Sequence, residues 1–443
     1  MSIASTLPPE ILGAIVLEAR QKRRVRYRIP LEVVVSHVCQ HWREVVIGTP
    51  LLWTHIDVYS NDSMKWVPSY LERSKPCLLD LRIDTYDDEK RLGRASTTSA
   101  PCTPIVRLLA DHFERVQYFF WLMRSEPAFD PWCHYLEDIA APVLERFRVI
   151  STRHIRPWSQ LPYTIFAGGA PRLSLVDLLV AAPSLPPLQN VTTLMLAQNT
   201  YKDPLKIKFT EIVRSAPNLA HLSIGSLAVP EGLGVPFISN SLRSLKFNCD
   251  PAAIIIPFLR DLDAPQLESL WLACPPYISL QPFLYSPHVR HVNKFPSLRY
   301  LTLQKHDFPN LQDFATAFHN VTHLHLLYPQ HSGQGLMSMR QDDPSMPVLW
   351  PDLHTLVIQT VHDAYSQSGT AITQNFIAQC HDLCSRRKWM DHRVEMLLFD
   401  SDLFRIATSS GTLIEASTVA PITRDNYQEY WWNLFEDDTL RML

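Results

Sequence analysis

The chain has 443 residues, of which 46% are hydrophobic and 19% charged, so it can bury a large core. Its formal net charge of −3 gives no electrostatic reason to expect nucleic-acid binding. Only 12 glycines stand against 35 prolines, and the glycine spacings that cradle phosphates or form a nucleophile elbow are absent, as is the H-E-x-x-H zinc motif. We therefore expect a non-catalytic protein without a cofactor or a bound metal.

The eight scattered cysteines are typical of reduced, buried thiols and do not resemble a secreted disulfide framework. The pattern Cys380-His381-x-x-Cys384, with His392 nearby, hints at metal ligands, but no second pair completes a tetrahedral site. A structural helix is the favoured interpretation. With no secretory signal and no apolar run near the ~18 residues of a membrane span, we expect a soluble cytoplasmic or nuclear protein.

The sequence predicts two amphipathic helices near the amino terminus. The first, within Leu7–Leu17, opens with prolines, which a first helical turn tolerates because its amides need no partner there. The second covers Val33–Val46, where apolar side chains at three- and four-residue steps form one stripe: Val34, Val35, Val38, Trp42 and Val46. Thr49-Pro50 ends this helix, because a residue before proline is displaced from helical conformation.

Four pieces in this order resemble an F-box of the form abundant in mushroom-forming fungi: Leu7-Pro8-Pro9-Glu10-Ile11-Leu12, Val38-Cys39, Trp42-Arg43 and Pro50-Leu51-Leu52-Trp53. The resemblance implies docking on a Skp-family adaptor and membership of a cullin–RING ubiquitin ligase. It assigns adaptor binding to Leu7, Pro8, Ile11, Leu12, Ile15, Val38, Cys39 and Trp42. The alternative is that the two helices only cap the domain that follows them.

A basic run in residues 22–28 separates the two helices and is longer than a compact F-box needs. Three interpretations stay open for it: a nuclear-import signal, a contact for an acidic partner, and, most plainly, a solvated basic loop. After the F-box-like region the sequence predicts a strand in Trp53–Val58, a helix in Trp66–Ser74 and a strand in Cys77–Ile83. Residues 84–104 are charged and then rich in serine and threonine, which is typical of an exposed, mobile loop.

Beyond this loop a degenerate repeat, Leu-x-x-Leu-x-Leu, often follows a proline and recurs at steps of 18 to 32 residues. The first apolar positions of its copies are Val116, Leu144, Leu173, Val191, Leu219, Leu242, Leu267, Leu298, Val321 and Leu353. One copy cannot bury its apolar face alone, whereas stacked copies share a continuous core. The pattern resembles an irregular leucine-rich-repeat solenoid with a parallel β-sheet, so we expect an α/β fold with a helical F-box at its start.

In each copy the residues on either side of the second leucine alternate away from the core and line the inner face of the predicted sheet. Six of them are candidate contacts for a protein substrate: Arg146, Arg148, Trp271, Tyr300, His323 and His325. Arginines and exposed aromatic residues are enriched in binding hot spots. The two histidines allow metal binding or pH sensing, with solvated histidines as the simpler interpretation. That terminal segments cover part of this face is an equally open alternative.

We expect four segments: an F-box domain in residues 1–58, a connection in residues 59–110, a solenoid in residues 111–400 and a capping segment in residues 401–443. Near the end, the aromatic-rich Tyr427–Phe435 is expected to cover the solenoid, or to serve as a docking tail. The predicted function is substrate recognition for a Skp–cullin–F-box ubiquitin ligase. The alternative is a non-catalytic interaction scaffold without a role in ubiquitination.

Overall fold

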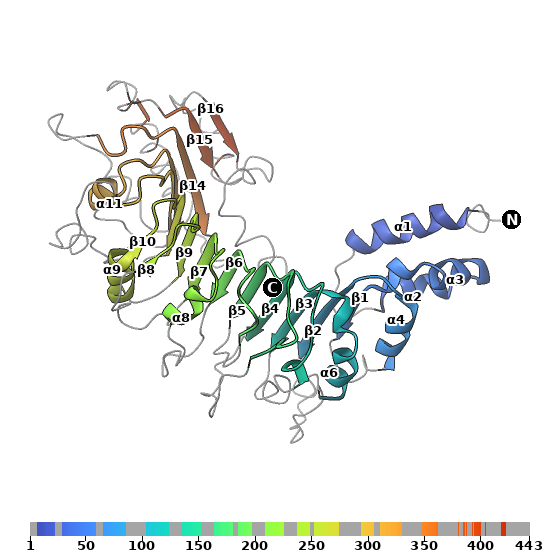
Figure 1. Cartoon of the computed structure of the whole chain (residues 1–443). Coiled ribbons are helices and arrows are strands. Elements are labelled where there is room, and N and C mark those ends of the chain that lie inside the picture. The colour runs from blue at the N-terminus through green and yellow to red at the C-terminus, as the bar shows by residue number, and fades with distance from the viewer. Residues whose placement is uncertain are drawn as a thin grey trace, which may run out of the picture. The chain divides into compact units, whose positions relative to one another are not determined.

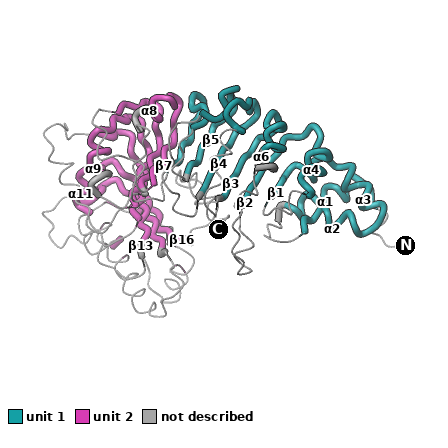
Figure 2. Tube along the Cα trace, turned by 90° about the horizontal axis from the view of Figure 1, so that it is seen from below, with its two compact units in different colours: residues 1–203 teal, residues 204–443 magenta. Residues whose placement is uncertain are grey.

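The computed structural model describes residues 7–22, 29–58, 65–85, 103–123, 135–151, 164–179, 185–196, 209–225, 237–248, 252–273, 294–304, 311–329 and 348–361, with short stretches between 380 and 421. The chain divides into two compact units, unit 1 in residues 1–203 and unit 2 in residues 204–443 (Figure 2). This division into two units does not test the four predicted segments, which stay predictions.

The described residues at the start of unit 1 form three α-helices and one 3-10 helix (Figure 1): α1 (Pro9–Lys22), α2 (Leu31–Ser36), α3 (Gln40–Ile47) and η2 (Pro50–Trp53). Prolines lie in the first turns of α1 and η2, where a missing amide costs no hydrogen bond. The helix predicted within Leu7–Leu17 is therefore α1, which runs five residues further.

The prediction of one continuous helix over Val33–Val46 is wrong. The backbone amides of His37 and Val38 bond to carbonyl oxygens only three residues back, which tightens and ends α2. Cys39 then adopts an extended conformation, with φ −158°, before α3 begins. The five residues of the predicted stripe therefore do not share one helical face.

In the described part of unit 1, six parallel strands form a sheet and lie in chain order: β1 (His55–Val58), β2 (Leu79–Thr85), β3 (Val116–Met123), β4 (Arg146–Ser151), β5 (Leu175–Leu179) and β6 (Thr193–Leu196). Among the described residues, helix α4 (Val67–Arg73) lies between β1 and β2 in the chain, and helix α6 (Thr103–Ala110) lies between β2 and β3. A parallel pair needs such a crossover, since a tight hairpin turn can join only antiparallel strands.

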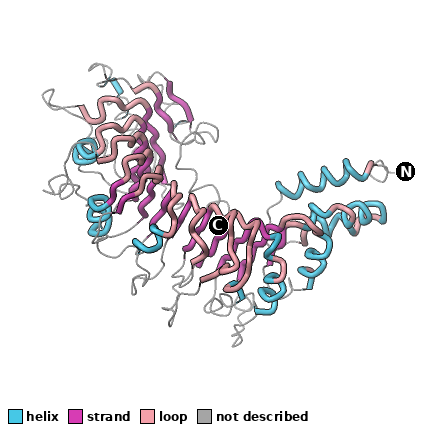
Figure 3. The backbone as a smooth tube through the Cα atoms, in the orientation of Figure 1, coloured by secondary structure: helices cyan, strands magenta, loops and turns pink. Residues whose placement is uncertain are grey.

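In the described part of unit 2, eight parallel strands form the main sheet: β7 (His221–Gly225), β9 (Ser244–Asn248), β11 (Ser269–Ala273), β12 (Tyr300–Gln304), β13 (His323–Pro329), β14 (Thr355–Val361), β15 (Met396–Phe399) and β16 (Thr418–Pro421). Strands are magenta in Figure 3. Three helices with described bounds belong to this unit: α8 (Phe209–Arg214), α9 (Ala252–Asp261) and α11 (Leu311–Ala317). The short strands β8 (Phe237–Ile238) and β10 (Leu262–Asp263) pair with each other in parallel.

The repeated leucines form the core on one face of each sheet. In unit 2, Leu270, Leu301, Leu324 and Leu356 occupy matching positions on neighbouring strands and are fully buried. Ahead of these strands, the amide of each repeat donates to a carbonyl oxygen of the repeat before it, as Arg299 does to Glu268 at 2.9 Å. Each repeat therefore uses its neighbour for both apolar burial and backbone hydrogen bonds.

Every predicted copy of the repeat contains a strand, so the expectation of a mixed α/β protein with a large parallel sheet is confirmed. The strand β16 was missed, because Thr418–Pro421 lacks the leucine pattern. The predicted loop, residues 84–104, is wrong at both ends, since β2 extends to Thr85 and α6 begins at Thr103. The rest of that loop, residues 23–28 of the basic run and Tyr427–Phe435 lie outside the described residues.

Candidate functional site

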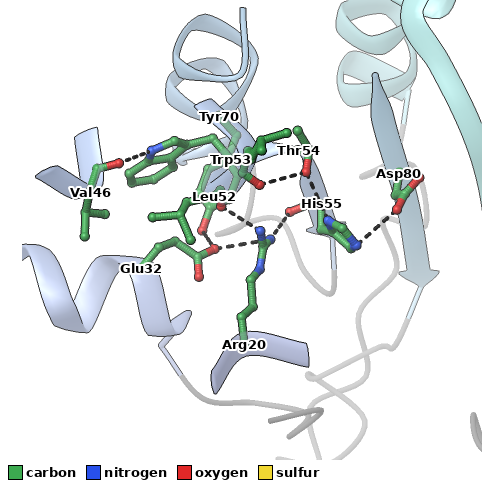
Figure 4. A network of polar contacts seen from close by, with 10 residues as sticks. Arg20, Glu32, Val46, Leu52, Trp53, Thr54, His55, Tyr70 and Asp80 are labelled. Atoms are coloured by element: carbon green, nitrogen blue, oxygen red, sulfur yellow. Dashed lines mark hydrogen bonds and ion pairs between the residues drawn. The ribbon is translucent and has the colours of Figure 1, made fainter. Parts of the chain in front are cut away.

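A polar network fixes the N-terminal helices to the first strand (Figure 4). Arg20 of α1 donates to the carbonyl oxygens of Leu52, at 2.7 Å, and His55, at 3.0 Å, and lies 3.5 Å from Glu32 of α2. Tyr70 of α4 donates to the same carboxylate at 2.5 Å. Burial and the Glu32 charge raise the pKa of Tyr70, so its hydroxyl stays a donor. These partners offset the desolvation of the buried Glu32 carboxylate.

A second set of contacts holds the opposite end of α1 and the turn at η2. The carbonyl oxygen of Leu7 accepts a hydrogen bond from His41 Nε2 at 3.0 Å. The buried Trp53 donates from its indole nitrogen to the carbonyl oxygen of Val46 at 2.9 Å, and the Arg73 guanidinium lies 4.4 Å from its ring centroid. The helix α1 is thus held at both ends, which restricts its orientation within unit 1.

These fixed helices leave large apolar side chains in solvent. Ten large hydrophobic residues are exposed in the described parts of the chain, and seven belong to residues 11–51: Ile11, Ile15, Ile29, Val34, Val38, Ile47 and Leu51. Single exposed apolar residues are normal on a protein surface, whereas a concentration of them indicates an interaction site. We call these seven the N-terminal apolar residues.

The structure brings most of the predicted adaptor-binding residues to the surface. Ile11, Ile15 and Val38 are 50%, 51% and 58% exposed, and Pro8 is exposed as well. Three others are partly exposed: Leu7, Cys39 and Trp42.

Leu12 departs from this prediction, because it is only 1% exposed. It lies four residues before the buried Val16, on the face of α1 that packs inside unit 1. Leu12 therefore packs α1 against the rest of unit 1 and does not contribute to the exposed surface of α1.

Sequence reasoning missed four of the N-terminal apolar residues: Ile29, Val34, Ile47 and Leu51. Val34 belongs to the predicted apolar stripe but is not among the predicted adaptor-binding residues, and it is 42% exposed. Leu51 was grouped with Leu52 and Trp53, yet it is 54% exposed while both neighbours are buried. The sequence does contain one signal for these exposed residues, which is their clustering. Two short helices can bury only one face each, so such a dense apolar segment indicates that some of its side chains stay exposed.

The predicted inner-face positions align across neighbouring strands in both units. In unit 1, Phe120 of β3 lies opposite Arg148 of β4, and in unit 2 Trp271 of β11 lies opposite Thr302 of β12. This strand register confirms the predicted alternation. Of the six candidate substrate contacts, Arg146 and Arg148 belong to unit 1 and the other four to unit 2.

The expected exposure of these candidates is wrong for three of them. Arg148 is 3% exposed, Trp271 is 2% exposed and His325 is fully buried. Arg146 is exposed, while Tyr300 and His323 are partly buried. The inner face is therefore more enclosed than a sheet with one solvated side, as is usual for parallel sheets.

In unit 1 the enclosed part of the inner face holds a charged pair beside an aromatic ring. Arg148 places Nε 2.9 Å and Nη2 2.8 Å from the same Asp177 oxygen, and both residues are buried. Burial lowers and the Asp177 carboxylate raises the pKa of Arg148, with a net rise. The guanidinium groups of Arg82 and Arg148 lie 5.3 and 5.9 Å from the Phe120 ring centroid. The remaining candidate here, Arg146, lies 5.7 Å from the Tyr118 ring.

In unit 2 the inner face holds an apolar cluster: Trp271, Leu327, Val357 and Leu398, all buried. The indole nitrogen of Trp271 donates to Gln304 Oε1 at 3.1 Å, and Lys246 Nζ lies 3.6 Å from its ring centroid. This arrangement makes Trp271 a packed structural residue and leaves little of it for a partner.

Aromatic and imidazole rings lie next to one another beside this cluster. The ring centroid of His323 lies 4.6 Å from that of Tyr300 and 5.9 Å from that of His354, whose Nε2 is 2.6 Å from a Glu395 oxygen. Burial, and next the His354 charge, lowers the pKa of His323 to about 4, and burial lowers that of His325 to about 3. Both imidazoles are therefore neutral at pH 7, and the fully buried His325 contradicts the prediction of solvated histidines.

The cysteine cluster near the C-terminal end does not form a metal site within the described residues. Cys380 and Cys384 are buried, and burial raises the pKa of both thiols, that of Cys384 to about 11. His381 lies outside the described residues.

No protein-family model matches this chain, and comparison with curated proteins found no similar sequence. Across the parts of the chain that the structure describes, none of the helices has the length and apolar character needed to cross a membrane.

Proposed function

We propose that this chain is the substrate-recognition subunit of a Skp–cullin–F-box ubiquitin ligase. Its N-terminal helices dock on a Skp-family adaptor, and its parallel sheets bind a protein target. The observation that carries this proposal is the concentration of exposed apolar side chains on the helices with the F-box-like sequence. Such side chains gain stability when a partner's apolar surface covers them.

The contacts of α1 support this role in a second way. Its exposed Ile11 and Ile15 lie between two attachment points, the Leu7 carbonyl bonded to His41 and the Arg20 guanidinium. A helix already held in place loses less conformational entropy when it binds. The chain itself performs no chemistry in this proposal: it raises the effective concentration of a target near the ubiquitin-charged enzyme.

Co-purification with the adaptor and cullin tests the proposal. The full chain, expressed in a mushroom-forming fungus, is expected to recover both, and the double variant Ile11→Asp/Ile15→Asp is expected to recover at least about tenfold less adaptor. Ile238→Asp in unit 2 is a matched control, because Ile238 is also an exposed isoleucine, at 64%. Unchanged recovery with the double variant would contradict adaptor docking through α1.

A second measurement separates a ligase subunit from a scaffold that only binds the adaptor. Proteins that co-purify with the chain are expected to accumulate when cullin activity is inhibited, because their ubiquitination stops. Unchanged turnover of these proteins, with adaptor binding intact, would favour the scaffold.

A further inference from the structure

On the inner face of unit 1, side chains at matching positions of neighbouring strands form a row that contains several charged residues. Arg82 is one of them. On β2 it lies opposite Asp57 of β1 and Phe120 of β3, and the row continues through Arg148 to Asp177. Figure 2 shows β2, β3 and β4 next to one another in unit 1. The row thus has an arginine on each side of one phenylalanine ring.

The two arginines differ in how their charge is satisfied. Arg148 has its carboxylate in Asp177, and both side chains are almost fully enclosed. Arg82 lies against the Phe120 ring, but its Nε is buried and has no hydrogen-bond acceptor within the described residues. Buried donors are nearly always paired, so an unpaired one calls for an explanation.

Two described carboxylates near Arg82 in the strand register do not supply that acceptor. Asp80, in the adjacent row, binds His55 Nε2 at 3.0 Å. Asp57, directly opposite, is exposed, and no ion pair joins it to Arg82 within the described residues. Among the described residues, Arg82 thus presents a cation beside an aromatic ring, and none of them supplies an acceptor for its Nε.

We propose that Arg82 anchors an anion-binding subsite on the inner face of unit 1, which takes a carboxylate or phosphate group carried by a segment of the target protein. A guanidinium donates to such groups through two parallel N–H bonds. The Phe120 ring shields one face of the cation from water, which strengthens its attraction for an anion. The identity of the occupant rests on the proposed function, whereas the anion site does not depend on adaptor binding.

Arginine side-chain NMR of the full chain, without adaptor, tests this subsite. The Nε–Hε signal of Arg82, assigned by its loss in Arg82→Lys, is followed during separate titrations with glutarate and with inorganic phosphate. It is expected to shift downfield and saturate, while the signal of the exposed Arg172 moves little and without saturation. The anion that saturates at lower concentration identifies the group that the site prefers. No saturating shift with either anion, or equal shifts for the two arginines, would overturn the proposal.

Substitutions of Asp57 and of Arg82 are expected to change anion binding in opposite directions. Its carboxylate competes electrostatically with an incoming anion, so Asp57→Asn should tighten the binding of the preferred anion about two- to fivefold. Arg82→Gln should abolish the binding. Unchanged affinity in Asp57→Asn would contradict a site centred on Arg82. Adaptor co-purification of both variants is expected to equal that of the parent chain, so a failure here is distinguishable from a failure of the proposed function.

Discussion

In unit 1 the inner-face row through Phe120 contains Arg82, Arg148 and Asp177, whereas the row through Trp271 in unit 2 continues with Thr302, His325, Val357 and Leu398. Both rows are set by the same parallel register, and both contain fully enclosed side chains. In unit 1 the enclosed residues are held by an ion pair, and in unit 2 by apolar packing. The parallel register thus determines which residues are neighbours, but it does not determine whether they are charged or apolar. Substitutions on the two inner faces are therefore expected to change stability in different ways.

The largest expected effect is on the buried ion pair of unit 1. Asp177→Leu leaves the Arg148 charge buried without its carboxylate, so the free energy of unfolding should fall by about 3–5 kcal/mol. The double variant Asp177→Leu/Arg148→Met removes both charges and should recover most of this loss. Chemical denaturation measures each value. A single-variant loss below about 1 kcal/mol would show that the pair is not shielded from solvent.

The apolar cluster of unit 2 should behave as a second core. Leu398→Ala removes a fully buried side chain and is expected to lower the free energy of unfolding by about 2–4 kcal/mol. Met396→Ala, two residues earlier on the same face but only partly buried, is the control and should cost less. If Met396→Ala lowers the free energy of unfolding as much as Leu398→Ala does, or more, the inner face of unit 2 is not packed as described.

Acid should weaken unit 2 through its buried histidines. The folded-state pKa of His323, about 4, lies below the ordinary value of 6.5, so the unfolded chain binds more protons between these pH values and stability falls as pH drops through this window. His323→Gln should reduce that fall, as seen in denaturation midpoints at about pH 7 and pH 4.5. The exposed His37→Gln is the control and should change nothing. A pH dependence of His323→Gln identical to that of the parent chain would rule out this contribution.

The smallest expected effect concerns an exposed ion pair. Arg243 Nη1 lies 3.0 Å from Glu268 Oε1, with 47% and 29% of these side chains exposed. Arg243→Ala should lower the free energy of unfolding by less than about 1 kcal/mol, and added salt should reduce the difference further. A loss comparable to that of Asp177→Leu would mean that exposure does not explain the contrast between the two pairs.

The sequence predicted the strands well, because a buried leucine at every second position is a local pattern that needs no knowledge of distant contacts. The same alternation correctly placed Arg148 and Trp271 on the inner face. It did not reveal their burial, since that depends on packing that a single repeat does not encode.

In the N-terminal region, local sequence patterns predicted the structure less well. Periodicity suggested one helix through Val38, but tight i→i−3 hydrogen bonds and the extended Cys39 divide it. That Ile11 and Ile15 of α1 face outward while Leu12 is buried also depends on where η2 and β1 lie, because Arg20 ties α1 to their backbone carbonyls. Helix existence was predictable from local pattern, whereas the exposed face required tertiary contacts.

Hydrogen exchange of the full chain, with and without a purified Skp-family adaptor from a mushroom-forming fungus, tests the central claim most directly. The account predicts at least about tenfold slower exchange in α1 and in residues 34–39 when the adaptor is present, with the strands of unit 2 unchanged. Unchanged exchange in α1, or protection confined to unit 2, would contradict the claim that the N-terminal apolar residues bind another protein.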